Sequence, residues 1–141
     1  MTSIQFFFPA RNISLRSRNE LKQFIKKIFR KEQKRLGQLT YVFCSDEFLL
    51  GINQSHLQHD YYTDIISFDL SGKNGPVNGE IYISVDRVRD NAAQLNVPIN
   101  QELHRVIFHG ILHLCGYKDK QPKDKKRMTA AEDSCLRDYF G

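Results

Sequence analysis

The chain has 141 residues, of which 40% are apolar and 26% are charged, as is typical of one globular domain spanning residues 1–141. Lys and Arg outnumber Asp and Glu by 21 to 16, and the resulting net charge of +5 favours an anionic partner such as RNA. No apolar run is long enough to cross a bilayer and no secretory signal opens the chain, so we expect a soluble cytoplasmic protein without membrane contacts. The three cysteines are widely spaced and form no C-x-x-C pair, which predicts reduced thiols.

The first part of the chain predicts two strands with a helix between them. An apolar run over 4–8 is ended by Pro9, and a β-prone run covers 39–44. Between them, apolar residues recur every three or four positions over 18–36, which predicts an amphipathic helix ended by Gly37. Its opposite face is basic, and it is either a solvated face or a stripe that faces RNA. The basic residues are Lys22, Lys26, Lys27, Arg30, Lys31, Lys34 and Arg35.

The remaining elements predict an α+β fold, with one small mixed sheet of about four strands and about five helices. Asp46 is expected to cap a short helix to Asn53, followed by a polar loop to Thr63. Ser84 suits the start of the next helix, which Pro98 ends, and Asn100 suits the start of the one after it. The other predicted elements are strands at 65–69 and 79–84, a turn at 71–78, a buried helix at 100–116 and a last helix at 123–139.

The pattern H-x-x-x-H-x-x-G-Y-x-D in the buried helix suggests a metal site. His109 and His113 are four residues apart, so their rings project from one helix face a turn apart. Gly116 then ends the helix and lets Asp119 return a carboxylate to the same face. The alternative is a pair of core histidines satisfied by hydrogen bonds, but a metal ion would give both imidazoles a partner in an otherwise apolar helix.

Two histidines and one carboxylate leave a coordination position for water, as in catalytic zinc sites. A metal-bound water can supply hydroxide near neutral pH, so hydrolysis is the expected chemistry. The same ligands occur in Fe(II) oxygenases, although usually on strands. Gly110 stands where metallopeptidases of the H-E-x-x-H type carry a catalytic glutamate, which disfavours peptidase chemistry.

Three segments resemble the bacterial YbeY endoribonuclease family. Residues 109–119 are similar to its signature H-G-x-L-H-L-x-G-Y-D-H, and Glu102 and Leu103 fit the start of the same helix. Asn53 with residues 60–68, and then residues 79–84, are similar to two further family motifs in the same order.

This resemblance implies a single-strand-specific, zinc-dependent endoribonuclease that matures the 3′ end of 16S rRNA and acts in ribosome quality control. The partners would be rRNA and the small ribosomal subunit, with no DNA, and the chain would be a monomer. His109, His113 and Asp119 would hold one Zn²⁺, with nickel or iron as alternatives, and the metal-bound water would attack the phosphodiester.

The chain departs from the family pattern at two positions. Asp119 replaces the family's third histidine ligand, and Leu57 replaces a loop arginine thought to hold the RNA phosphate. The missing arginine favours an alternative function, a non-catalytic, metal-stabilised ribosome-assembly factor. A small metallopeptidase-like hydrolase is a third alternative, which the H-x-x-x-H spacing supports and Gly110 opposes.

The remaining roles have several candidates. The general base is unknown, and Asp64, Glu80 and Asp60 are candidates because they lie in segments that match the family. Lys118, Lys120 and His59 are expected to bind substrate, with His56 as a further candidate. A basic rim is expected beside the site, where it would be either an ordinary charged surface or a path for RNA phosphates. Its residues are Lys118, Lys120, Lys123, Lys125, Lys126 and Arg127.

Overall fold

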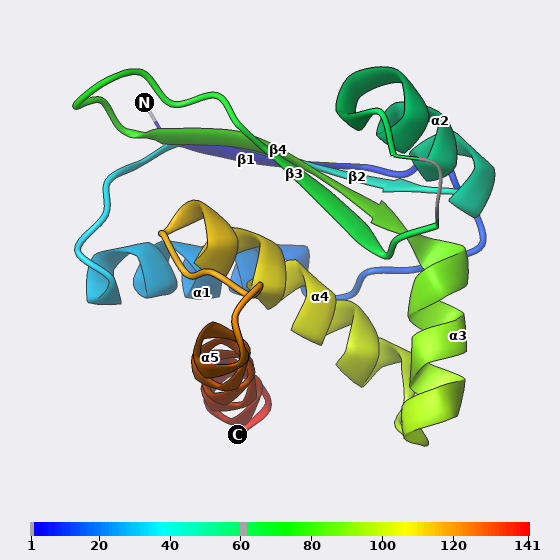
Figure 1. Ribbon diagram of the computed structural model, residues 1–141. Coiled ribbons are helices and arrows are strands. Elements are labelled where there is room, and N and C mark those ends of the chain that lie inside the picture. The colour runs from blue at the N-terminus through cyan, green and yellow to red at the C-terminus, as the bar shows by residue number, and fades with distance from the viewer. Residues whose placement is uncertain (1, 60–61) are drawn as a thin grey trace.

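The computed structural model describes residues 2–59 and 62–141, and its centre is a four-stranded mixed sheet with helices on both faces (Figure 1). The strands are β1 (Ser3–Phe7), β2 (Leu36–Cys44), β3 (Ile65–Asp69) and β4 (Val77–Ser84). The helices are α1 (Arg18–Lys31), α2 (Asp46–Leu57), α3 (Val85–Leu95), α4 (Ile99–Leu114) and α5 (Pro122–Phe140). These elements confirm the α+β fold predicted from the sequence.

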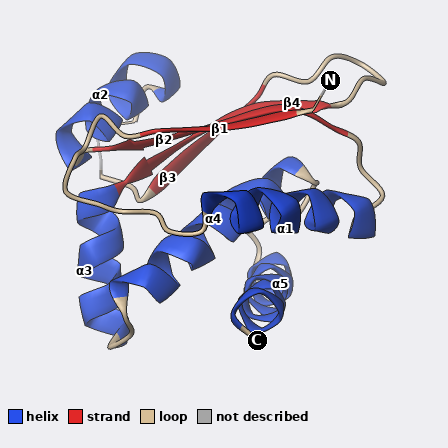
Figure 2. Ribbon diagram, turned by 180° about the vertical axis from the view of Figure 1, so that it is seen from behind, coloured by secondary structure: helices blue, strands red, loops and turns tan. Residues whose placement is uncertain are grey.

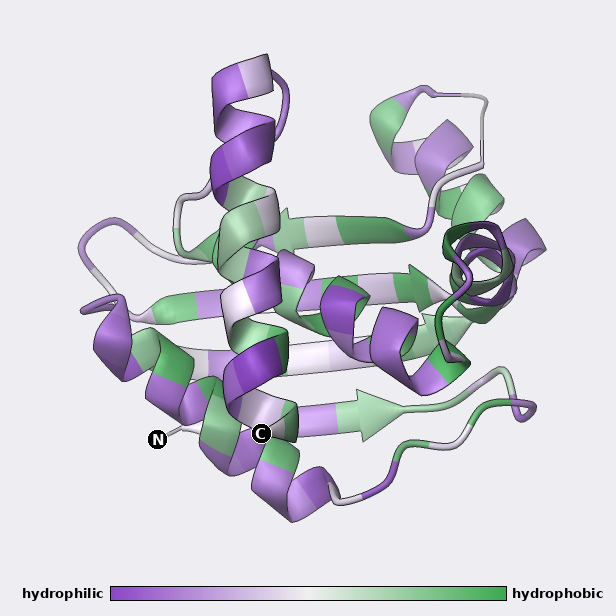
Figure 3. Ribbon diagram, turned by 90° about the horizontal axis from the view of Figure 1, so that it is seen from below, coloured by the Kyte–Doolittle hydropathy of each residue, from purple (hydrophilic) through white to green (hydrophobic). Residues whose placement is uncertain are grey.

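The sheet has the strand order β1-β2-β4-β3, in which only β3 runs antiparallel to its neighbour. Helices α1 and α4 lie side by side under one face, with α5 beneath them, and α2 covers one end of the other face (Figures 1 and 2). Seen from below, α5 crosses α4, and its hydrophilic first turns extend beyond β3 at the edge of the sheet (Figure 3).

The main core fills the space between the sheet and the helices beneath it. Alternate residues of β2 point into it, and Leu39, Tyr41 and Phe43 are all buried. Burying a large apolar side chain contributes about 1.5–3 kcal/mol, so this alternation fixes which face of β2 meets the helices. The Tyr41 hydroxyl also donates to the carbonyl oxygen of Ile107 at 2.9 Å, which ties β2 to the middle of α4.

Helix α1 ends earlier than predicted, at Lys31 instead of Leu36. Leu36 continues the apolar rhythm of the helix, but it begins β2 and pairs with Val77. Gln33 has a φ of 59°, and this left-handed residue separates the helix from the strand. The pairing partner of Leu36 is 41 positions away, so a local pattern could not reveal it.

Two other helix caps differ from the predictions, by one residue in α2 and by two in α4. Ser45, not Asp46, caps α2, because its Oγ accepts from the Phe48 N–H at 3.2 Å. Helix α2 also continues past Asn53 to Leu57. Helix α4 begins at Ile99 after Pro98, so Asn100 lies inside its first turn. By contrast, the predicted cap at Ser84 is present, and its Oγ accepts from the Arg87 N–H at 3.2 Å.

The cysteines Cys44, Cys115 and Cys135 are free and buried, in agreement with the prediction of reduced thiols. Burial raises the pKa of the Cys44 and Cys115 thiols to about 12, so neither is a thiolate near neutral pH.

Candidate active site

Helix α4 presents two histidines beside the point where it touches the sheet. A Cβ added to Gly110 would lie 2.9 Å from Cδ1 of Ile81, so the glycine lets helix and sheet approach closely without displacing this side chain. His109 comes directly before this contact and is partly exposed, whereas His113 is exposed. Their rings are nearly parallel, with centroids 6.4 Å apart and planes inclined by 7°. They therefore stack along one side of α4.

A sharp turn after α4 brings Asp119 back to His109. Gly116 has a φ of +108°, its N–H donates to the His113 carbonyl at 3.0 Å, and the Tyr117 N–H donates to the Leu112 carbonyl at 3.0 Å. The chain reverses, and Asp119 Oδ2 lies 3.3 Å from His109 Nε2. The carboxylate thus lies beside the histidine, as the spacing predicted.

Tyr117 anchors this turn to two helices. Its hydroxyl donates at 3.3 Å to Oε2 of Glu32, the residue that caps the end of α1, and the Arg127 guanidinium of α5 lies 4.6 Å from the ring centroid. The segment that carries Asp119 is therefore held from both sides.

Hydrogen bonds define which nitrogen of each histidine is available to a ligand. His113 Nδ1 lies 3.0 Å from the Tyr117 carbonyl oxygen, which can only accept, so Nδ1 carries the hydrogen. His109 Nδ1 lies 2.6 Å from Glu132 Oε2, and the carboxylate favours the same tautomer. In its neutral form each imidazole is therefore left with an Nε2 lone pair, the usual arrangement of histidines that bind metals.

A group of buried charges supports His109 from behind. Glu132 of α5 is only 3% exposed, and its other oxygen, Oε1, accepts from Arg105 Nη1 at 2.9 Å. Arg105 Nε also donates to Glu102 Oε1 at 2.7 Å, and Glu102 is 1% exposed. The hydrogen bonds to Glu102 raise the pKa of Arg105 and outweigh its burial, so the guanidinium stays charged.

The surroundings of His109 are acidic. Burial lowers the pKa of His109, but Glu132, Asp119 and Asp64 together reverse this effect and the pKa is raised. Burial also raises the pKa of Asp64, against the opposing charges of Arg105 and His109. Asp64 accepts a hydrogen bond from Asn91 Nδ2 at 3.1 Å. Four carboxylates lie around His109 and Arg105, and Arg105 is the single guanidinium among them. This excess of negative charge favours the binding of a cation. The carboxylates are those of Asp64, Glu102, Asp119 and Glu132.

The donors fit a zinc-type ion in their chemistry but do not converge completely. Two ligands of a tetrahedral zinc lie roughly 3.3 Å apart, and the 3.3 Å between His109 Nε2 and Asp119 Oδ2 matches this separation. Across the described residues, however, no three His, Cys, Asp or Glu side chains are arranged to hold a metal ion. The tautomers and the His109–Asp119 pair therefore suit a metal, whereas His113 lies a turn away along the helix.

The family model named Endoribonuclease YbeY matches residues 9–140. The chain belongs to the endoribonuclease YbeY family. A YbeY endoribonuclease from Cytophaga hutchinsonii is 48% identical over 134 residues, covering 95% of this chain and 94% of the relative. Another from Porphyromonas gingivalis is 46% identical over 136 residues, covering 96% and 89%. The solution structure of TM1509 from Thermotoga maritima is 26% identical, has a TM-score of 0.62, and is matched over 100% of this chain and 90% of that one. Membership of the YbeY family supports an endoribonuclease, whose substrate is RNA.

The candidate general bases lie in different places. Asp64 is close enough to His109 for each to shift the pKa of the other. Glu80 lies on the opposite face of the sheet, because its neighbour Ile81 points toward α4, and it accepts from the Tyr82 hydroxyl at 3.2 Å. The structure therefore brings Asp64 to the site and leaves Glu80 away from it. Asp60 lies outside the described residues.

The candidate substrate-binding residues lie in two places, beside Asp119 and near the end of α2. Lys118 and Lys120 are exposed on either side of Asp119. His59 is exposed just beyond α2, and its N–H donates to the Asn53 carbonyl at 3.0 Å. His56 packs edge-on against Phe68, with ring centroids 6.1 Å apart, in a hollow on the same sheet face as Glu80. Leu57, at the position of the family arginine, is the last residue of α2 and is exposed.

Glu132 and Arg105 were not among the site residues predicted from the sequence. One available signal was that Glu132 lies between Met128 and Cys135 on the apolar side of α5, where a carboxylate needs a partner. Another was that Glu102, Arg105 and His109 follow the i, i+3, i+7 spacing of one helix face. The sequence could not show that the two helices meet at these residues.

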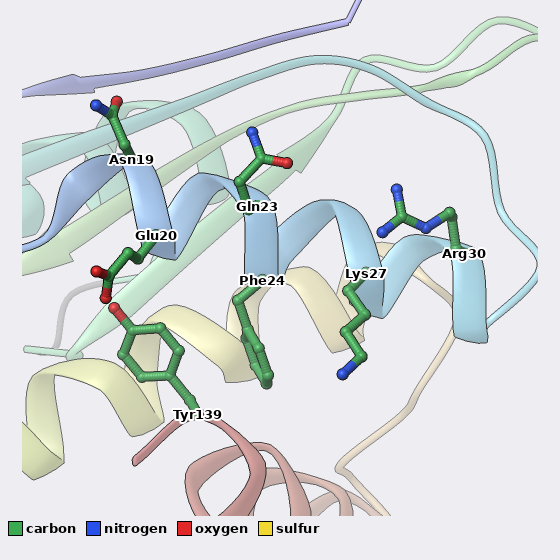
Figure 4. A pocket seen from close by; sticks show the side chains of 7 residues that line it. All are labelled: Asn19, Glu20, Gln23, Phe24, Lys27, Arg30 and Tyr139. Carbon is green, nitrogen blue, oxygen red and sulfur yellow. The ribbon is translucent and has the colours of Figure 1, made fainter. Parts of the chain in front are cut away.

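A larger hollow of about 550 Å³ lies elsewhere, between α1 and the end of α5 (Figure 4). Phe24 and Tyr139, whose ring centroids are 5.0 Å apart, line it, and Lys27 and Arg30 lie toward the C-terminal end of α1. None of the candidate site residues lines it, so it is separate from the His109 site. Within residues 2–59 and 62–141, no helix combines the length and the apolar character needed to span a membrane.

Proposed function

We propose that this chain is a metal-dependent endoribonuclease that cuts single-stranded RNA, with one zinc ion held by His109, His113 and Asp119. The observation that carries the proposal is the contact of His109 Nε2 with Asp119 Oδ2 at 3.3 Å, in a member of an endoribonuclease family. A zinc ion in such a site supplies a hydroxide equivalent near neutral pH and a positive charge for the phosphate.

The charge balance supports a requirement for a cation. An RNA phosphate that approached the unmetallated site would meet the carboxylates of Asp64, Asp119 and Glu132, with Arg105 already paired to two carboxylates. Like charges in a partly buried site repel strongly, so the anionic substrate needs a bound cation to approach.

The protein residues then have distinct roles. We assign proton transfer from the attacking water to Asp64, which lies near His109 and is oriented by the hydrogen bond from Asn91. Lys118 and Lys120 flank Asp119 and are placed to hold phosphates on either side of the scissile bond. We assign His59, just beyond α2, as a third residue that contacts the substrate. Maturation of the 16S rRNA 3′ end and ribosome quality control in the cytoplasm, with a monomeric enzyme, complete the proposal.

The decisive experiment compares wild type with Asp119→Ala for metal content and for cleavage of a single-stranded rRNA fragment. We expect about one zinc per wild-type chain, and both zinc and cleavage should fall in the variant. Asp133→Ala is the matched control, because Asp133 is an exposed aspartate next to Glu132 whose loss changes the net charge equally.

Other outcomes assign the chain to another class. If wild type holds zinc, loses stability in chelator and never cuts RNA, the metal is structural and the chain is an assembly factor. Cleavage of casein instead of RNA would identify a peptidase-like hydrolase. Full zinc content in Asp119→Ala would remove Asp119 from the ligand set.

A further inference from the structure

A chain of buried polar contacts leads from the interior of the protein to the candidate site. Glu102 and Arg105 lie on α4, Glu132 on α5 and His109 again on α4, and the links are 2.7, 2.9 and 2.6 Å long. Glu132 of α5 therefore connects Arg105 to His109, both of which lie on α4.

Glu132 occupies a buried position where an apolar side chain would lose less hydration free energy on folding. Its neighbours on the buried side of α5 are Met128 and Cys135, and a buried carboxylate loses several kcal/mol of hydration unless it is paired. Both oxygens are used, Oε1 by Arg105 and Oε2 by His109. Buried ion pairs often contribute no more stability than well-packed apolar side chains. Stability alone therefore does not explain a carboxylate at this position.

We propose that Glu132 is a positioning residue, held by Arg105, that fixes His109 in the tautomer with hydrogen on Nδ1. This inference rests on the proposed metal site, because it explains how that site is prepared. With Nδ1–H donated to Glu132, the Nε2 lone pair faces Asp119; with the other tautomer, a hydrogen on Nε2 would block a metal ligand.

Arg105 makes this arrangement specific. Its Nη1 donates to Glu132 Oε1 and so holds the second oxygen toward Nδ1 of His109. Its other contacts go to Glu102, which keeps the guanidinium in place. Oε2 of Glu132 is thus directed at the ring, and an acceptor in this position stabilises the Nδ1–H form.

The test is nitrogen NMR of histidine side chains in the metal-free protein, at alkaline pH where the imidazoles are neutral. The variant Glu132→Leu removes the acceptor and nearly preserves volume. We expect His109 to carry hydrogen on Nδ1 in wild type and to shift mainly to Nε2 in the variant. Asp46→Asn is the control: it weakens a partly buried ion pair with Arg87 at the α2–α3 junction and should leave the His109 tautomer unchanged.

A second variant covers the case in which Glu132→Leu does not fold. In Glu132→Gln the side-chain shape is kept, and Arg105, which can only donate, should take the amide oxygen. The amide NH₂ then faces Nδ1 and requires it to accept, so the Nε2–H tautomer is again expected. Zinc affinity, measured by competition with a chromophoric chelator, should fall about 10–100-fold in both variants.

The outcomes separate this inference from the proposed function. If the variants keep the Nδ1–H tautomer and wild-type zinc affinity, Glu132 is only a structural residue and the inference is wrong. If wild type shows the Nδ1–H form but binds no zinc, the positioning contact exists and the metal proposal fails. Loss of the tautomer in Asp46→Asn as well would mean that general destabilisation, not Glu132, controls the ring.

Discussion

His104 is the buried histidine that the candidate site does not use. It is 2% exposed, Nδ1 lies 2.7 Å from the Asn100 carbonyl oxygen, and Nε2 has no hydrogen-bond partner among the described residues. The ring packs between Tyr139 and Phe140 at the end of α5, with centroids 5.3 and 5.0 Å away. A neutral imidazole suits this aromatic site, whereas an imidazolium would lose its hydration there.

We predict that His104 makes the protein less stable in mild acid. Burial lowers its pKa, against the opposing effect of the Asn100 hydrogen bond, so on acidification the unfolded chain takes up a proton before the folded one. This contribution to stability is complete above the unfolded pKa of about 6.5 and is lost as the pH falls toward the lower folded pKa. The loss cannot exceed about 1.4 kcal/mol per pH unit for one group.

The measurement compares urea unfolding of wild type and His104→Phe between about pH 7 and pH 5. Groups shared by the two proteins contribute equally and cancel in the difference. Wild type should lose stability relative to the variant as the pH falls, and a constant difference would show that His104 does not titrate in this range.

At the scale of elements, the contact between α4 and the sheet depends on a missing side chain. A Cβ at Gly110 would lie 2.9 Å from Cδ1 and 3.1 Å from Cγ2 of Ile81, and 3.1 Å from Cδ1 of Ile65. Because these atoms belong to two strands, a larger residue requires both isoleucine side chains to shift or α4 to move away from the sheet. Such a displacement would also move His109, the next residue on the helix.

Gly110→Val should therefore lower the free energy of unfolding by about 1–3 kcal/mol, since overpacking outweighs the small gain in helix propensity. Gly51→Ala is the matched control: Gly51 lies inside α2, and an added Cβ has nothing within 4 Å. This change should stabilise the protein by up to about 1 kcal/mol. Urea unfolding measures both, and equal effects of the two substitutions would contradict the close contact.

The elements themselves could largely be predicted from local patterns, whereas several of their ends could not. The spacing of apolar residues predicted α1. Its last predicted residue, Leu36, instead belongs to β2, where it pairs with Val77 of β4. Ser45 and Asp46 are both residue types that cap helices. The Asp46 carboxylate instead accepts hydrogen bonds from Ser84 and Arg87 at the start of α3, so Ser45 caps α2. Tertiary contacts therefore decided the element boundaries that the local sequence left open.

At the scale of the whole molecule, the candidate site also combines contacts that local sequence predicts with contacts that only the tertiary packing determines. Spacing within one segment predicted that Asp119 returns to His109, because a helix and a single glycine turn determine that geometry. The contact of Glu132 with His109 joins residues 23 positions apart through the packing of α5 on α4, and no local pattern contains it. Likewise, the sheet face occupied by Glu80 became clear only from the contact of its neighbour Ile81 with Gly110 of α4.

The distribution of charge over the whole molecule leads to the last prediction. Exposed basic residues lie both around Asp119 and on the outer face of α1, which includes Lys27 and Arg30. If RNA crosses the candidate site, phosphates contact the first group, and each phosphate contact adds about 0.7 to the slope of log affinity against log salt for a single strand. A solvated α1 face would add nothing to this slope.

We expect Lys118→Ala with Lys120→Ala to reduce the salt slope by about 1.4, the value for two lost phosphate contacts. Lys27→Ala with Arg30→Ala removes the same charge from the exposed face of α1 and should leave the slope unchanged. Fluorescence anisotropy of a labelled single-stranded RNA, in chelator to prevent cleavage, measures both. A reduction only in the α1 pair would place the RNA on α1, and equal small changes in both would mean that net charge, not a local path, drives binding. The slope separates these cases because it counts ions released at contacts, whereas affinity alone also follows the total charge.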